Sequence, residues 1–85
     1  MQIKEFKYQT KQTKTSLLAC HGVFLARRSE GAFAVFLFQV EGFYVEMFYD
    51  ETEAEIGYIR SFSSVEELTP YLNAIDLSEI FEKRN

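Results

Sequence analysis

The stretch from Phe38 to Asp50, FQVEGFYVEMFYD, constrains the fold of this 85-residue chain more than any other. Its Glu41-Gly42 step separates two runs of aromatic and aliphatic residues, which is typical of a β-hairpin with a two-residue turn. Side chains along a strand alternate between the two faces of a sheet. Pairing Val40 with Phe43 therefore assigns each residue of the hairpin to one of the two faces of the sheet. It predicts apolar side chains on both faces.

One face of the hairpin, which we call the first face, carries only apolar or aromatic pairs. These pairs are Val40 with Phe43, Phe38 with Val45, Phe36 with Met47, and Ala34 with Tyr49. A continuous apolar surface of this kind is typical of a core. We expect C-terminal helices to cover it.

The second face mixes polar and apolar pairs: Gln39 with Tyr44, Leu37 with Glu46, Val35 with Phe48, and Phe33 with Asp50. The preceding segment, 16–28, is interpreted as one long strand. A register with Phe24 beside Phe36 extends the apolar part of the second face, but a slip of one residue would swap the faces of that strand, so its register stays open. The residues expected to form an interface on this face are Val23, Leu25, Phe33, Val35, Leu37, Phe48 and Tyr44.

The rest of the chain predicts further strands over 3–10 and 56–62 and a helical region over 64–83. Ser64 and Glu67 have the spacing of a capping box, as do Asp76 and Glu79. Pro70 leaves two interpretations open: one kinked helix, or a second helix capped by Thr69 with Pro70 at its first position. We therefore predict one α+β domain over residues 1–85. It is an antiparallel meander of four to five strands with one or two C-terminal helices packed on one face.

Helices on one face would leave the second face uncovered. Six contiguous apolar side chains expose several hundred Å², and the largest patch on a soluble monomer is about 300–600 Å² and is often functional. The sequence therefore predicts a homodimer or a protein partner on this face. The alternative is that the N-terminal strand or the turn at 10–16 folds across it.

The charge of the chain is unevenly distributed along the sequence. Residues 1–28 carry six basic residues and one acid, for a net charge of +5; residues 29–85 carry three basic residues and twelve acids, for −9, and the sum is −4. A single-stranded nucleic-acid-binding domain is the alternative function, with sheet aromatics stacking on bases and basic side chains along the phosphates. Those basic residues would be Lys4, Lys7, Lys11, Lys14, Arg27 and Arg28. The net acidity and the aliphatic second face favour the protein-interaction module.

Nothing in the sequence indicates catalysis. His21 is the only histidine, and its neighbour Cys20, the only cysteine, would point to the opposite side of a strand. No phosphate-binding loop, hydrolase motif or zinc spacing occurs. We therefore predict a non-enzymatic protein without cofactor or metal. A cytoplasmic location is expected, because the chain starts without a signal-peptide pattern and its longest uncharged run, 33–40, is too short to span a bilayer.

Arg60 shares a side of its predicted strand with apolar residues. A cation in such a position needs a carboxylate or access to solvent. We hypothesise that Arg60 forms a structural ion pair with Glu66 or Glu67.

Overall fold

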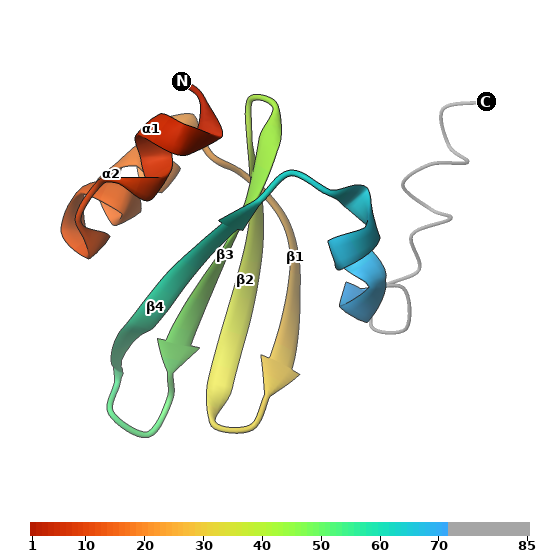
Figure 1. Cartoon of the computed structure of the whole chain (residues 1–85). Helices are drawn as coiled ribbons and strands as arrows, with labels where there is room; N and C mark the ends of the chain where they lie inside the picture. The colour runs from red at the N-terminus through yellow and green to blue at the C-terminus, as the bar shows by residue number, and fades with distance from the viewer. Residues whose placement is uncertain (72–85) are drawn as a thin grey trace.

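The computed structural model describes residues 1–71 as two helices, a four-stranded sheet and a final 3-10 helix (Figure 1). The elements, in chain order, are α1 (Ile3–Lys7), α2 (Lys11–His21), β1 (Val23–Glu30), β2 (Phe33–Val40), β3 (Phe43–Asp50), β4 (Glu55–Phe62) and η1 (Val65–Tyr71). The second capping pattern, at Asp76 and Glu79, lies outside the described residues, as does most of the predicted 64–83 helix.

The four strands form an antiparallel meander in the order β1-β2-β3-β4, so the α+β class and the meander are confirmed. The β2–β3 hairpin has the predicted register over its whole length, from Val40 opposite Phe43 to Phe33 opposite Asp50. Glu41 has a φ of 50°, in the left-handed region that such tight hairpin turns require.

The N-terminal quarter of the chain is mostly helical, so the strands predicted at 3–10 and 16–28 are wrong up to residue 21. The Glu5 carboxylate accepts a hydrogen bond from the Gln2 backbone N–H at 2.7 Å, and the Thr10 hydroxyl accepts one from the Thr13 N–H at 3.1 Å. These are N-terminal caps, which satisfy N–H groups that the helix leaves free. Helix α2 ends at His21 with Gly22 as its C-terminal cap, where a Cβ atom would lie only 2.7 Å from the Leu18 carbonyl oxygen.

Strand β1 keeps Phe24 on the predicted face but not at the predicted position. Phe24 lies opposite Phe38 rather than Phe36, and Val23 opposite Gln39. The strand runs on through Glu30, two residues beyond the predicted end at residue 28, and only Gly31 and Ala32 connect it to β2. A bulge at Leu25 then changes the register, and Ala26 lies opposite Leu37. A bulge sets two residues of one strand opposite one residue of its partner, so the residues of β1 after Leu25 lie on the faces opposite to those predicted.

The two faces of the sheet are covered by different ends of the chain. On the first face, Phe6 and Leu18 from α1 and α2 pack against Val40, Phe43 and Val45. The part of the first face formed by Val40, Phe43 and Val45 is therefore a core, but the N-terminal helices cover it, whereas we predicted C-terminal ones. On the second face, Tyr71 of η1 packs with Ala26, Leu37 and Phe62. In Figure 1, α1 and α2 lie near the upper end of the sheet, η1 lies beside β1, and the lower half of the strands has no helix over it.

None of the helices within residues 1–71 is long and apolar enough to cross a lipid bilayer.

Candidate functional site

The centre of the second face is covered by the chain itself. Val35, Leu37 and Phe48 are at most 3% exposed. Leu25, Phe33 and Tyr44 are partly buried, and of the seven residues predicted for the interface only Val23 is largely exposed, at 61%. The described residues therefore do not form an uncovered apolar surface across the middle of this face. A role of these side chains in binding stays a prediction.

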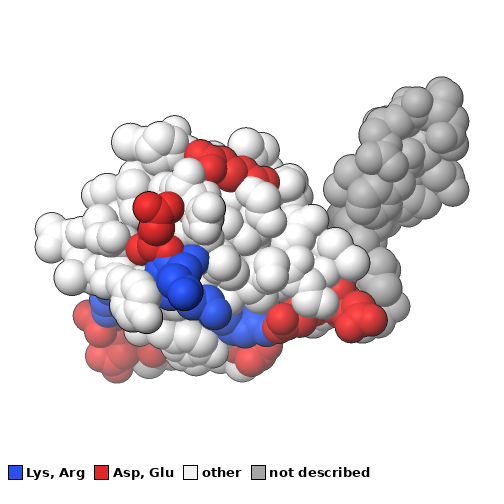
Figure 2. All heavy atoms as spheres, turned by 45° about the horizontal axis from the view of Figure 1, so that its top comes forward, with Lys and Arg blue, Asp and Glu red and all other residues white. Residues whose placement is uncertain are grey.

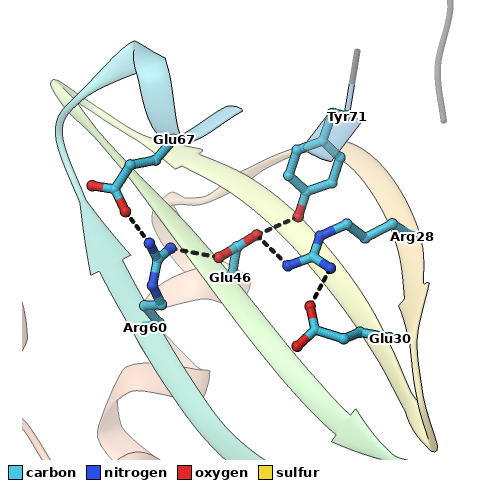
Figure 3. A network of polar contacts seen from close by, with 6 residues as sticks. All are labelled: Arg28, Glu30, Glu46, Arg60, Glu67 and Tyr71. Atoms are coloured by element: carbon cyan, nitrogen blue, oxygen red, sulfur yellow. Dashed lines mark hydrogen bonds and ion pairs between the residues drawn. The ribbon is translucent and has the colours of Figure 1, made fainter. Parts of the chain in front are cut away.

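A buried carboxylate organises the second face (Figure 3). Glu46 of β3 is 2% exposed, and its Oε1 accepts a hydrogen bond from Arg60 Nη1 at 2.6 Å. Its Oε2 accepts hydrogen bonds from Tyr71 Oη at 2.7 Å and from Arg28 Nη2 at 3.2 Å. The outer ends of this network are Glu67, which pairs with Arg60, and Glu30, which pairs with Arg28.

The network ties η1 to three strands. A buried carboxylate is tolerated only when charged and polar partners replace its water, and here β1, β4 and η1 each supply one. The hypothesis that Arg60 pairs with Glu67 is confirmed. The Glu67 carboxylate is thus engaged with Arg60, while Ser64 Oγ accepts from the Glu66 N–H at 3.3 Å. Sequence reasoning missed Glu46 as the central partner, although a lone acid between apolar residues of a strand is a signal for such a site.

A hollow of about 260 Å³ lies beside this network, between Arg28, Arg60 and the side chain of Tyr58. Three carboxylates and two guanidinium groups line it, from Glu30, Glu46, Glu67, Arg28 and Arg60. Both guanidinium groups already contact carboxylates, and the local sum of formal charges is −1. The hollow therefore offers little attraction to an anion.

Burial raises the pKa of the Tyr71 hydroxyl well above its ordinary value of about 10, and the hydrogen bond that it donates to Glu46 adds to this effect. A group whose folded pKa lies above its unfolded pKa stabilises the fold below the unfolded value. This stabilisation is lost as the pH rises from about 10 through the folded pKa.

We expect absorbance titration of tyrosinate to show one component that ionises above the ordinary range, and Tyr71→Phe to remove it. Stability of the native protein should fall above about pH 10, where unfolded tyrosine ionises. Tyr44→Phe is the control, because Tyr44 donates none of the hydrogen bonds that Glu46 accepts, so its change should leave the late component intact. A late component that persists in Tyr71→Phe would contradict the buried hydrogen bond.

The first face has an accessible aromatic surface beyond the helices. It comprises Phe24, Arg27, Phe36, Phe38 and Tyr49, from three consecutive strands, and we call it the aromatic surface. The Phe24 ring lies 6.4 Å from the Phe36 ring and 5.8 Å from the Phe38 ring, between ring centres. The Arg27 guanidinium lies 5.4 Å from the centre of the Phe36 ring. Phe24 is 54% exposed, and Phe36, Phe38 and Tyr49 are partly exposed.

The basic residues proposed for nucleic-acid binding do not all lie on one surface, because Arg28 is on the second face and α1 and α2 pack on the first. Lys4 and Lys7 belong to α1, Lys11 and Lys14 to α2, and Arg27 and Arg28 to β1. Arg28 is held in the Glu46 network, and Lys11 Nζ donates to the Ile56 carbonyl at 2.8 Å. In the view of Figure 2, basic side chains form a short stripe between acidic groups, and uncharged side chains fill most of the surface.

Cys20 and His21 lie in the last turn of α2, and both are exposed. Their side chains therefore do not have the strand arrangement that the sequence predicted. Residues 1–71 contain no group of three acidic, histidine or cysteine side chains arranged to hold a metal ion.

Comparison with known proteins adds no family: no family model, curated protein or solved structure matches this chain. The geometry and charge of its own residues carry the proposals that follow.

Proposed function

We propose that this protein is a non-enzymatic interaction module that self-associates through the aromatic surface. One observation carries this proposal: an aromatic set that the helices leave accessible next to a core that they cover. Aromatic residues and arginine are enriched in protein interfaces and supply most of the residues whose truncation weakens binding strongly. A domain of this size also buries a smaller fraction of its surface on folding than a larger domain does, so association adds stability that its core lacks.

The face of the sheet supports association better than its edge. Strand β1 is an edge strand, with a bulge at Leu25 and with Arg27 and Arg28 near its middle. Bulges and charged side chains on an edge hinder the addition of another strand. An antiparallel pairing of two β1 strands would also bring like charges together. We therefore place the contact on the aromatic side chains and not on the backbone of β1.

Single-stranded nucleic acid is the second candidate, because the aromatic surface presents rings and Arg27 on one sheet face. Base stacking on exposed rings needs basic side chains along the strand path. Here the nearest one, Arg27, has the Glu51 carboxylate at 3.6 Å, and three more acids, Asp50, Glu53 and Glu55, lie in or beside the β3–β4 turn. Repulsion of phosphates by these groups favours the protein-interaction module.

Phe24→Ser should convert the associated protein into monomer. We expect sedimentation velocity of the wild type at increasing concentrations to show a rising sedimentation coefficient, and the variant to stay at the monomer value. Truncation of an aromatic residue that is a hot spot of an interface costs about 2 kcal/mol or more, which is about thirtyfold in Kd, and we expect Phe24 to be such a residue.

Val65→Ser is the matched control, because Val65 is 65% exposed but lies on η1, away from the aromatic surface. It should associate like the wild type. A wild type that sediments as a monomer at every concentration would contradict the proposal. Binding of an oligonucleotide with a steep dependence on salt, lost in Phe24→Ser, would favour the second candidate instead.

A further inference from the structure

We infer that the aromatic surface of one copy contacts the region formed by α1 and the residue after it in a second copy, in a two-fold dimer. This region comprises Lys4 and Lys7 of α1 and the following Tyr8, and we call it the basic corner. The inference rests on the proposed function, since it names the part of the second copy that meets the aromatic surface.

The basic corner has the features of a ligand for an aromatic, acidic surface. Tyr8 is 82% exposed, the largest fraction among the exposed large apolar residues of the described part of the chain. A shallow hollow of about 350 Å³ lies between Ile3, Lys4, Lys7 and Tyr8, so the ring stands beside apolar and basic groups together. Within residues 1–71, neither Lys4 nor Lys7 makes an ion pair. Both ammonium groups are thus available to a partner.

The aromatic surface has the complementary charge at its border. Tyr49 leads directly into the β3–β4 turn, which brings Asp50, Glu51, Glu53 and Glu55 to the lower end of the sheet. Asp50 Oδ1 accepts hydrogen bonds from the Thr52 and Glu53 N–H groups of its own turn. Glu51 is 3.6 Å from Arg27, and both of these side chains are more than half exposed, so this pair is weak. With Arg27 included, the formal charge of this border is −3.

The two surfaces match in chemistry and in position. A tyrosine ring against Phe24 and Phe36 forms aromatic contacts, while lysine ammonium groups meet turn carboxylates. Because α1 and α2 pack on the first face, the basic corner and the aromatic surface belong to the same side of the sheet. A two-fold rotation therefore allows both contacts to form at once, and the assembly closes as a dimer. This arrangement also uses the split of charge between the basic N-terminal part and the acidic remainder.

Charge reversal in separate chains tests the arrangement. Lys7→Glu and Glu53→Lys each place like charges at both contacts of a homodimer, and we expect each change to weaken association about tenfold at low salt. In an equimolar mixture, one contact of the mixed dimer has both charges reversed and the other is native. Association should therefore return to within about threefold of the wild type, which corresponds to about 0.7 kcal/mol.

Glu66→Lys is the control, because it makes the same charge change on η1. It should neither weaken association alone nor restore it when mixed with Lys7→Glu. Tyr8→Ser should weaken association without a charge change. Circular dichroism of each variant checks that it is folded.

The two proposals fail in different ways. If Phe24→Ser abolishes association but Lys7→Glu, Glu53→Lys and Tyr8→Ser associate like the wild type, the contact with the basic corner is wrong and the aromatic surface stays the interface. Weakening by the two charge variants without recovery in their mixture would also overturn the inference. If the wild type does not associate, both proposals fail.

Discussion

Phe6→Ala should destabilise the protein by about 3–5 kcal/mol, the usual cost of truncating a phenylalanine in a packed core. Phe6 is fully buried, and its ring lies 5.6 Å from that of Phe43, between ring centres. It belongs to the cluster through which α1 and α2 cover the first face. Since small domains have about 5–15 kcal/mol of stability in total, the loss should shift the urea midpoint strongly or unfold the chain.

Urea unfolding of Phe6→Ala and of Val65→Ala, measured at a protein concentration where the monomer dominates, tests this expectation. Val65 is 65% exposed, so its change should alter stability by less than about 0.5 kcal/mol. A loss below about 1 kcal/mol for Phe6→Ala, well under the cost of a core cavity, would mean that the N-terminal helices do not cover the sheet.

Glu46→Ala should cost about 3 kcal/mol, at the lower end of what is lost when one partner of a buried ion pair is removed. Without this carboxylate, Arg28 and Tyr71 lose their shared acceptor in a buried region. Arg60 loses less, because 40% of its side chain is exposed and Glu67 remains as its partner. We expect the contact between η1 and the sheet to weaken first, because the hydrogen bond from Tyr71 to Glu46 is one of the links between them.

Glu46→Gln separates the charge from the hydrogen bonds. The amide keeps an acceptor oxygen of nearly the same size but not the negative charge, so its loss of stability should be smaller than that of Glu46→Ala. Thermal unfolding of both variants provides the comparison. If Glu46→Ala is as stable as the wild type, the buried network does not hold η1 in place.

The hairpin could be predicted from the sequence because its information is local. Glu41-Gly42 fixes the length of the turn, and the period of two then determines each pair from Val40–Phe43 to Phe33–Asp50. For the same reason Val40, Phe43 and Val45 were correctly assigned to the core, whereas Phe36 and Tyr49 of the same predicted set are partly exposed. The N-terminal segment could not be assigned in this way. Phe6 and Tyr8 alternate as in a strand, and apolar runs such as Leu17–Leu18 fit either a strand or a helix. The capping hydrogen bonds of Glu5 and Thr10 favour helices instead.

The candidate sites required the tertiary structure. The pair of Arg60 with Glu67 was accessible from sequence, since a charge among apolar strand residues needs a partner. The position of Phe24 beside Phe38 depends on the bulge at Leu25, which no local pattern indicates. The accessibility of the aromatic surface depends on which end of the chain covers the first face, and this was the part that sequence reasoning assigned wrongly.

The most direct test of the account is an isotope-filtered NOE experiment on a mixture of labelled and unlabelled protein, which detects contacts between copies alone. We predict NOEs between protons of Phe24 or Phe36 in one copy and Tyr8 in the other. Intermolecular NOEs that map instead to η1 or to the edge of β4, or their absence in a sample that sediments as a monomer, would contradict it.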